Sequence, residues 1–143
     1  MNYIFDTNVI SELVSAQPDQ RVLNWVDSID SESVYLSAIT IGELKKGIDK
    51  LPQSHRKDHL NKWLEEDLLV RFKGRILPVD TLVALIWGGL LAHLESAGTP
   101  MPAIDSILAA TAASGGFTFV TRNTNDFEEA GISLYNPWSV ESA

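Results

Sequence analysis

The chain has 143 residues, no cysteine, 45% hydrophobic residues and a formal net charge of −8 at pH 7. A protein of this length buries roughly 70% of its unfolded surface without needing disulfides, so we expect one domain spanning residues 1–143. The absence of cysteine excludes disulfide scaffolds and thiolate chemistry, and the acidic balance argues against broad electrostatic attraction to nucleic acid.

The basic residues are unevenly distributed along the chain. Residues 45–75 hold nine of the eleven Lys and Arg residues together with five acids, which gives this segment a charge of +4. The rest of the chain carries two bases and fourteen acids. A solvated amphipathic helix explains the basic run, but such a flank also suits a polyanion bound at the rim of an acidic region.

Short β-branched and aromatic runs alternate with longer stretches of helical period, which is the pattern of βαβ units. Strands are predicted at residues 3–5, 34–37, 76–79 and 117–121, and residues 132–135 are predicted to add an edge strand. We therefore expect an α/β fold with a central, mostly parallel sheet of four to five strands flanked by helices.

Apolar residues at three-to-four spacing predict the helices between these strands. The stripes are Val22, Val26 and Ile29, then Ile41, Leu44, Ile48 and Leu51, and then Leu60, Trp63, Leu64, Leu68 and Phe72. Two further helices are predicted at residues 81–97 and 103–114.

The longest apolar stretch, residues 82–92, is far shorter than the ~20 residues that cross a bilayer. We interpret it as a buried helix in which Gly88 and Gly89 allow close packing on the sheet, with a subunit contact as the alternative. No basic leader precedes Asp6, so neither an export signal nor membrane association is predicted, and a cytoplasmic location is expected.

Four acidic residues follow predicted strands or open predicted helices: Asp6, Glu43, Asp105 and Asp126. Asp6, Glu43 and Asp126 come after strands, on the side where the loops of a parallel sheet converge on ligands. Two carboxylates roughly 4 Å apart repel by about 4 kcal/mol at an effective dielectric constant of ~20. A pocket shared by these acids would therefore bind a hard divalent cation.

Each acid also has a local structural explanation. Thr40 and Glu43 have the spacing of a capping box, in which Glu43 accepts a hydrogen bond from a backbone amide. Asp105 complements the dipole at a helix start, and Asn125 or Asp126 is placed to cap a short final helix. The joint position of the four acids favours a metal site over four separate caps.

Other catalytic arrangements find less support in the sequence. His55 and His59 have the spacing of a zinc pair on a helix but lack the intervening glutamate of the His-Glu-x-x-His motif. Neither a Gly-x-Gly-x-x-Gly sequence nor a phosphate-binding loop is present. The segment after the first strand, Asp6-Thr7-Asn8, also lacks the paired aspartates that a magnesium phosphotransferase would need.

Four segments carry the acids and their polar neighbours. They are residues 5–12 (Phe-Asp-Thr-Asn-Val-Ile-Ser-Glu), 37–44 (Ser-Ala-Ile-Thr-Ile-Gly-Glu-Leu), 105–112 (Asp-Ser-Ile-Leu-Ala-Ala-Thr-Ala) and 120–127 (Val-Thr-Arg-Asn-Thr-Asn-Asp-Phe). In this order they resemble the PIN-domain family, and more narrowly the VapC-type toxins close to the FitB branch. The resemblance covers nearly the whole chain, down to Asn136-Pro137-Trp138.

This resemblance implies a ribonuclease that depends on Mg²⁺, or on Mn²⁺ as a substitute. It also implies a small VapB- or FitA-like antitoxin that holds the enzyme inactive, contact with DNA only through that antitoxin, and a homodimer or a dimer of dimers. The positions that match the family are the acids Asp6, Glu43 and Asp105, with Thr7, Asn8 and Thr121 as polar supports. Many relatives carry an aspartate where this chain has Asn123, so the fourth position falls to Asn123 or to Asp126.

The expected reaction is hydrolysis of RNA phosphodiesters by an activated water, which leaves 3′-hydroxyl and 5′-phosphate ends. Asp6 and Asp105 would bind the metal ion directly or through water, and Glu43 would orient or deprotonate the attacking water. The alternative is a non-catalytic partner in an antitoxin–operator DNA complex, in which substitution of these acids leaves biological activity intact.

Overall fold

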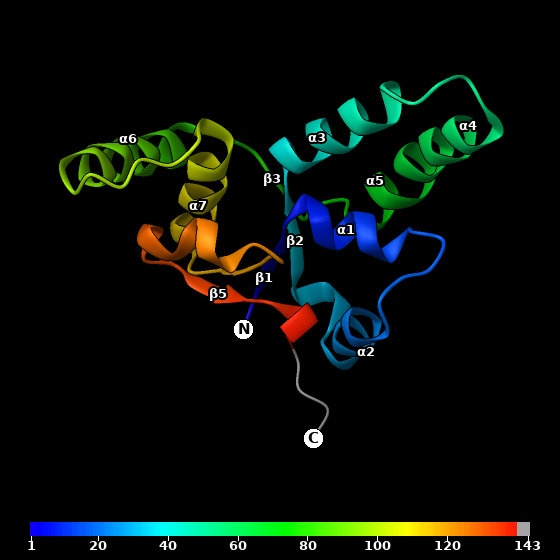
Figure 1. The fold of residues 1–143 in the computed structure, drawn as a ribbon, viewed down its shortest axis with the longest axis horizontal. Coiled ribbons are helices and arrows are strands. Elements are labelled where there is room, and N and C mark those ends of the chain that lie inside the picture. Colours follow the sequence, from blue (N-terminus) through cyan, green and yellow to red (C-terminus); the bar gives the residue numbers. More distant parts are fainter. Residues whose placement is uncertain (140–143) are drawn as a thin grey trace.

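The computed structural model describes residues 1–139, which fold around a five-stranded sheet (Figure 1). The strands are β1 (Tyr3–Phe5), β2 (Val34–Ser37), β3 (Ile76–Leu77), β4 (Thr118–Val120) and β5 (Ser133–Tyr135). Their order is β3-β2-β1-β4-β5, and every neighbouring pair is parallel. The predicted parallel sheet is confirmed, and the edge strand at residues 132–135 is present as β5.

Strand β3 is shorter than the predicted segment, residues 76–79. It ends at Leu77 because the next residue, Pro78, has no backbone N–H to donate to the ladder. The other predicted strands agree with the structure to within one residue at each end.

Helices fill the connections between the strands. The α-helices are α1 (Thr7–Leu13), α2 (Gln20–Ser28), α3 (Ala38–Asp49), α4 (His55–Lys62), α5 (Leu69–Arg71), α6 (Thr81–Ser96) and α7 (Ala103–Gly115). Short 3₁₀ turns form η1 (Ser31–Ser33), η3 (Thr124–Ala130) and η4 (Pro137–Ser139), and η2 (Trp63–Leu68) is a π-helix. The third predicted stripe therefore runs through α4, η2 and α5 rather than one uniform α-helix. Leu64, Leu68 and Phe72 of that stripe are buried as predicted.

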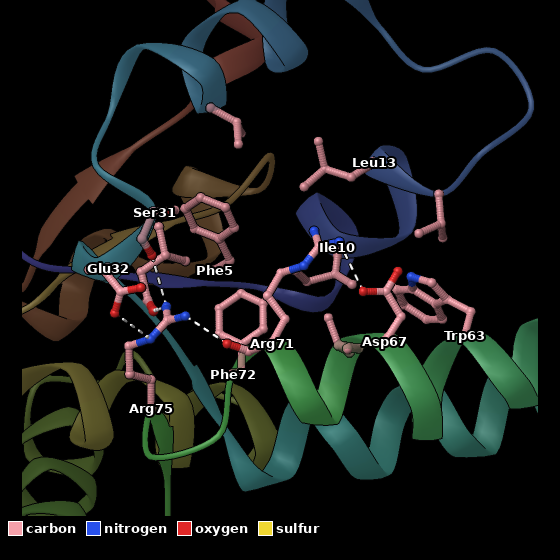
Figure 2. Close-up of a pocket in the computed structure, with 14 residues that line it drawn as sticks. Phe5, Ile10, Leu13, Ser31, Glu32, Trp63, Asp67, Arg71, Phe72 and Arg75 are labelled. Carbon is pink, nitrogen blue, oxygen red and sulfur yellow. Dashed lines mark hydrogen bonds and ion pairs between the residues drawn. The ribbon is translucent and has the colours of Figure 1, made fainter.

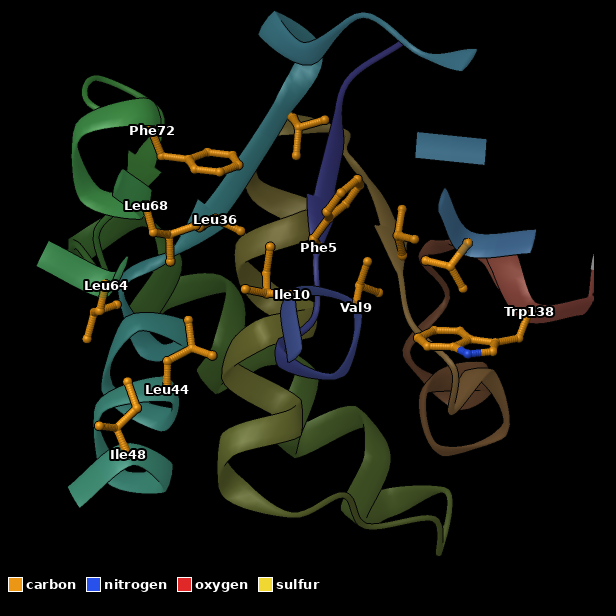
Figure 3. Packing of buried hydrophobic residues seen from close by; sticks show 13 residues of the cluster. Phe5, Val9, Ile10, Leu36, Leu44, Ile48, Leu64, Leu68, Phe72 and Trp138 are labelled. Atoms are coloured by element: carbon orange, nitrogen blue, oxygen red, sulfur yellow. The ribbon is translucent and has the colours of Figure 1, made fainter. Parts of the chain in front are cut away.

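Two apolar clusters cover the two faces of the sheet, and β1 contributes to both because successive strand residues point to opposite faces. Phe5 lies in a cluster with Val9 and Ile10 of α1 and Leu36 of β2, which Figure 3 shows together. Ile4 lies in the other cluster, with residues of α7, β4 and η3. Both faces of a parallel sheet are normally covered in this way.

Helix α6 departs from the prediction of a buried helix. It extends away from the sheet beside α7 (Figure 1), and the indole Nε1 of Trp87 donates a hydrogen bond to Ser106 Oγ of α7 at 2.9 Å. Leu82 and Leu85 remain 55% and 71% exposed, because the helix is apolar on nearly all sides while only one side meets α7.

The packing predicted for the two glycines of α6 is also wrong. A Cβ atom added at Gly88 or Gly89 would meet no neighbouring atom within 4 Å, so neither glycine allows close packing on the sheet. Among residues 1–139, no helix combines the length and the apolar character that crossing a membrane requires.

Candidate active site

The strand order places β1 at the topological switch point of the sheet. The chain runs from β1 outward to β2 and β3 on one side, and it later adds β4 and β5 on the other side. The loops that follow β1, β2 and β4 therefore diverge from one crevice at the carboxyl ends of the strands, where parallel sheets bind ligands. The segments with the predicted acids and their polar neighbours border this crevice.

Asp6 is the N-cap residue of α1 and is held by two hydrogen bonds. Its Oδ1 accepts from the backbone N–H of Thr7 at 2.8 Å, and its Oδ2 accepts from Thr121 Oγ1 at 2.8 Å. Thr121 is fully buried, and its hydroxyl oxygen also accepts from Asn8 Nδ2 at 3.3 Å and from the backbone N–H of Asn123 at 3.1 Å. This network fixes one carboxylate across the gap between β1 and β4.

Glu43 lies on the second turn of α3, and its Oε1 accepts a hydrogen bond from Thr7 Oγ1 at 2.6 Å. The capping-box explanation of Glu43 is wrong, because the N-cap of α3 is Ser37, whose hydroxyl accepts from the backbone N–H of Ile39. Thr40 is instead buried within the helix. Adjacent residues of the chain, Asp6 and Thr7, therefore connect to Thr121, the residue after β4, and to Glu43 of α3.

Asp105 is half-buried in the first turn of α7, as predicted, and its carboxylate completes a set of three that interact electrostatically. Desolvation raises the pKa of Asp6, and the charges of Glu43 and Asp105 raise it further against the effect of its hydrogen bonds to Thr121 and Thr7. Desolvation likewise raises the pKa of Asp105, with added repulsion from Asp126 and Glu43. The ionised forms of these acids are therefore destabilised when they are all charged, and a bound cation would stabilise them.

The structure separates the two candidates for the fourth position. Asn123 lines the same cavity as the three acids, whereas Asp126 is exposed in η3 and does not line it. Asp126 is still near enough for its charge to raise the pKa of Asp105. The N-cap of η3 is Asn123, and its side chain makes no capping hydrogen bond, so the local capping explanation of Asn125 or Asp126 is wrong.

The acids open onto a cavity of about 560 Å³. Its lining includes every predicted site residue except Thr121, which lies beneath Asp6, and Asp126. It also includes five residues that were not predicted as site residues: Ser11, Glu12, Ser15, Arg122 and Trp138. Glu12 and Trp138 lie inside segments that carried the family resemblance, but only the fold brings them to the cavity.

The donor set fits a hard divalent ion, because it consists of carboxylates that repel one another and an amide oxygen. Among residues 1–139, no group of three or more His, Cys, Asp or Glu side chains is arranged to hold an ion by itself. Mg²⁺ usually keeps several of its waters and uses only one or two carboxylates, so the fit is to a hydrated ion.

A second, larger cavity of about 680 Å³ lies beside α1 and the π-helix η2 (Figure 2). Its lining combines apolar residues with charged ones: Ile10, Leu13, Trp63, Leu68 and Phe72, with Glu32, Asp67, Arg71 and Arg75. The Arg75 guanidinium donates to the carbonyls of Ser31 and Arg71 at 2.8 Å each and stands over the Phe72 ring. A groove lined by Thr7, Glu43, Val14 and Trp63 shares residues with both cavities.

The sequence profile of the PIN domain matches residues 3–132, which is most of the chain. The chain belongs to the PIN-domain family. This PIN-domain chain is 42% identical to Toxin FitB of Neisseria gonorrhoeae over 135 residues, which cover 94% of the chain and 97% of FitB. It is 41% identical to VapC ribonuclease Y4jK of Sinorhizobium fredii, over 94% of the chain and 96% of that protein.

Solved structures of FitAB and VapBC resemble the chain closely. A structure described as FitAB bound to an IR36 DNA fragment superposes with a TM-score of 0.92 at 40% identity, covering 98% of both chains. DNA-bound VapBC from Salmonella typhimurium superposes with a TM-score of 0.78 at 25% identity, over 96% of this chain and 98% of that one. The resemblance to the PIN-domain family, and to its VapC and FitB branches, is confirmed.

Proposed function

We propose that residues 1–143 form one nuclease domain that acts as the ribonuclease toxin of a toxin–antitoxin pair and hydrolyses RNA phosphodiesters with the help of Mg²⁺, or of Mn²⁺ in its place. One observation carries this proposal: Asp6, Glu43 and Asp105, from three separate helices or helix caps, border a single cavity at the switch point of the sheet. The similarity to Toxin FitB and to a VapC ribonuclease supports it.

In this proposal Asp6 and Asp105 hold the hydrated metal ion, which supplies a Lewis acid that polarises water and offsets charge on the phosphate. Thr121 keeps the Asp6 carboxylate in one orientation through its hydroxyl donor. Asn8 in turn orients the Thr121 hydroxyl and approaches the backbone N–H of Arg122. The Asp6 carboxylate is thereby already oriented before a metal ion binds, which lowers the entropic cost of ordering this side chain on binding.

Glu43 is the proposed general base that orients or deprotonates the attacking water. Thr7 donates to Oε1 of Glu43, and no hydrogen bond from residues 1–139 reaches Oε2, so one carboxylate oxygen remains able to accept a proton. Asn123 is the proposed fourth ligand position because it lines the cavity, and it holds water without adding charge. Asp126 would act at longer range through its charge.

The proposed protein partner is a small VapB- or FitA-like antitoxin, and contact with DNA would occur only through it. Structures of FitAB and of VapBC with DNA support this assembly. The larger cavity in Figure 2 suits an apolar antitoxin segment, because apolar residues line it and its acids Glu32 and Asp67 already pair with Arg75 and Arg71. A chain bound there would reach Glu43 through the groove that joins the two cavities.

The experiment that tests the ribonuclease is metal-dependent cleavage after removal of any co-purified partner. Total RNA should be cut in Mg²⁺ or Mn²⁺, not in a chelator, and the products should carry 3′-hydroxyl and 5′-phosphate ends. Products with 2′,3′-cyclic phosphates would contradict the proposal, because that chemistry uses the RNA 2′-hydroxyl in place of water.

The alternative function, a non-catalytic partner in an operator-DNA complex, predicts a different outcome in cells. Asp6→Asn or Asp105→Asn would then leave growth inhibition intact, whereas the ribonuclease proposal predicts that both substitutions abolish it. Quantifying the soluble protein in the same cells separates loss of activity from loss of folding.

A further inference from the structure

The cavity that holds the acids has a single cationic side chain among the described residues that line it. Four acids line it, Asp6, Glu12, Glu43 and Asp105, against one base, Arg122. RNA is a polyanion, so a chain with net charge −8 must lower the repulsion locally where the backbone enters. A cationic contact at this point rests on the proposed function, in which RNA is the substrate.

Arg122 is anchored through its backbone and leaves its guanidinium open. Its N–H approaches Asn8 Oδ1 at 3.4 Å, and its carbonyl oxygen accepts from Asn136 Nδ2 at 3.2 Å. Its guanidinium carbon lies 5.3 Å from the centre of the Trp138 ring. Within residues 1–139, no carboxylate forms an ion pair with Arg122 at 4 Å or less.

Asp19, whose carboxylate interacts electrostatically with Arg122, already pairs with Arg21. Asp19 forms an ion pair with Arg21 at 2.8 Å, and that hydrogen-bonded pair is the main reason why the pKa of Asp19 falls to about 2. Arg122 adds only a smaller electrostatic contribution to the same carboxylate. The N–H donors of Arg122 are therefore not used up by Asp19.

The buried ring of Trp138 lies under the Arg122 guanidinium and is hydrogen-bonded to Glu12 at the end of α1. Its indole Nε1 donates to Glu12 Oε1 at 3.3 Å, and its backbone N–H donates to Asn136 Oδ1 at 2.9 Å. The other oxygen of Glu12 accepts from the backbone N–H of Asp19 at 3.3 Å. One acid at the end of α1 thus joins the C-terminal turn η4 to the loop between α1 and α2.

We propose that Arg122 binds an RNA phosphate adjacent to the bond that is cut, and that Trp138 is a positioning residue that holds the guanidinium beside the acids. A guanidinium stacked on an aromatic ring keeps its N–H groups at its edges, in the fork that matches two phosphate oxygens. The pair would guide the backbone across the carboxylates while Asp6, Glu43 and Asp105 perform the reaction.

RNA binding tests this proposal separately from cleavage. Fluorescence anisotropy with a labelled short single-stranded RNA, in chelator and on an Asp6→Asn background, measures affinity without turnover. Arg122→Gln should weaken binding about tenfold, the typical effect of losing a hydrogen bond to a charged group. The slope of log affinity against log salt should fall by about 0.7, which corresponds to one phosphate contact on a single strand. Arg122→Lys should keep the slope and recover only part of the affinity.

The matched control is Lys73→Gln, which removes the same charge from an exposed residue that lines neither cavity. In the cleaving protein, Arg122→Gln should raise KM about tenfold and change kcat by less than about threefold. Trp138→Leu should raise KM without changing net charge, and Trp138→Phe, which keeps a ring, should raise it less. Thermal unfolding shows whether each variant is folded at the assay temperature.

The possible results separate this proposal from the proposed function. If Arg122→Gln and Lys73→Gln give the same affinity, slope and KM while the unmodified protein cuts RNA, the role of Arg122 is refuted and the nuclease stands. If the unmodified protein does not cut RNA in Mg²⁺ or Mn²⁺, the nuclease fails, and the anisotropy experiment still measures the Arg122 contact.

Discussion

Neutralising Asp6 should stabilise the metal-free protein while abolishing its response to metal. The acid-lined cavity has a volume of about 560 Å³. If carboxylates across it are taken to be ~10 Å apart, they repel by about 1.7 kcal/mol at an effective dielectric constant of ~20. Screening at ~0.15 M salt lowers this to about 0.5 kcal/mol for each pair. Asp6 has two such neighbours, Glu43 and Asp105, so Asp6→Asn relieves about 1 kcal/mol.

Local structure should not cancel this gain. Asn and Asp are about equally good N-caps, so the amide oxygen of Asn can still accept from the Thr7 N–H. The Thr121 hydroxyl, which donates to Asp6 Oδ2, can accept from the new amide N–H₂ after rotating its proton. We therefore expect the melting temperature of the metal-free variant to rise by about 3 °C.

Thermal unfolding in chelator and then across a Mg²⁺ titration measures both halves of this prediction. Mg²⁺ at ~100 times its dissociation constant should stabilise the unmodified protein by about 2.7 kcal/mol and leave Asp6→Asn nearly unchanged. The control is Asp58→Asn, an exposed residue of α4 outside both cavities, which should change stability by less than about 0.5 kcal/mol. A variant that loses stability in chelator, or that responds to Mg²⁺ like the unmodified protein, would refute the reasoning.

Three further predictions concern pH, the proposed base and the exposed helix. Burial and neighbouring charges raise the folded-state pKa of Asp6 above the ordinary aspartate value of 3.8, so its charged form destabilises the fold. In chelator, Asp6→Asn should therefore have a higher free energy of unfolding than the unmodified protein at pH values above the raised pKa, and this difference should vanish as the pH falls toward 3.8. Urea titrations across this pH range measure the difference. A difference that does not change with pH would contradict the prediction. Thr7→Val removes the donor to Glu43 and should lower kcat about tenfold with little change in KM, and a rise in KM alone would contradict the assigned role. Leu85→Glu on the exposed side of α6 should convert the expected homodimer to a monomer in light scattering, and an unchanged mass would place the subunit contact elsewhere.

The fold, and the sheet edge at which Asp6 and Glu43 lie, were readable from sequence because both depend on local patterns. Alternating short strands and helical stripes predicted the parallel sheet, and the placement of Asp6 and Glu43 after β1 and β2 predicted the edge at which they meet. These inferences need only the periodicity of the chain and the rule that parallel strands share their carboxyl ends.

Other features depend on contacts between distant parts of the chain, which periodicity does not encode. Helix α6 is apolar enough to be buried, yet whether it is covered depends on how many neighbours reach it. Among residues 1–139, α7 packs along it and η3 makes a smaller contact. The π-helical turn η2 has the same apolar spacing as an α-helix, since the spacing of side chains does not report which carbonyl each N–H reaches.

The sequence by itself determined a parallel α/β sheet with carboxylates at the ends of its strands, because strand order along the chain and residue type are local properties. Only the tertiary structure decided that Glu43 bonds Thr7 rather than a helix cap, that Asn123 lines the cavity where Asp126 does not, and that Trp138 meets Glu12. The physical reason is distance along the chain: Glu12 and Trp138 lie 126 residues apart, and only the packing of the sheet fixes which side chains meet.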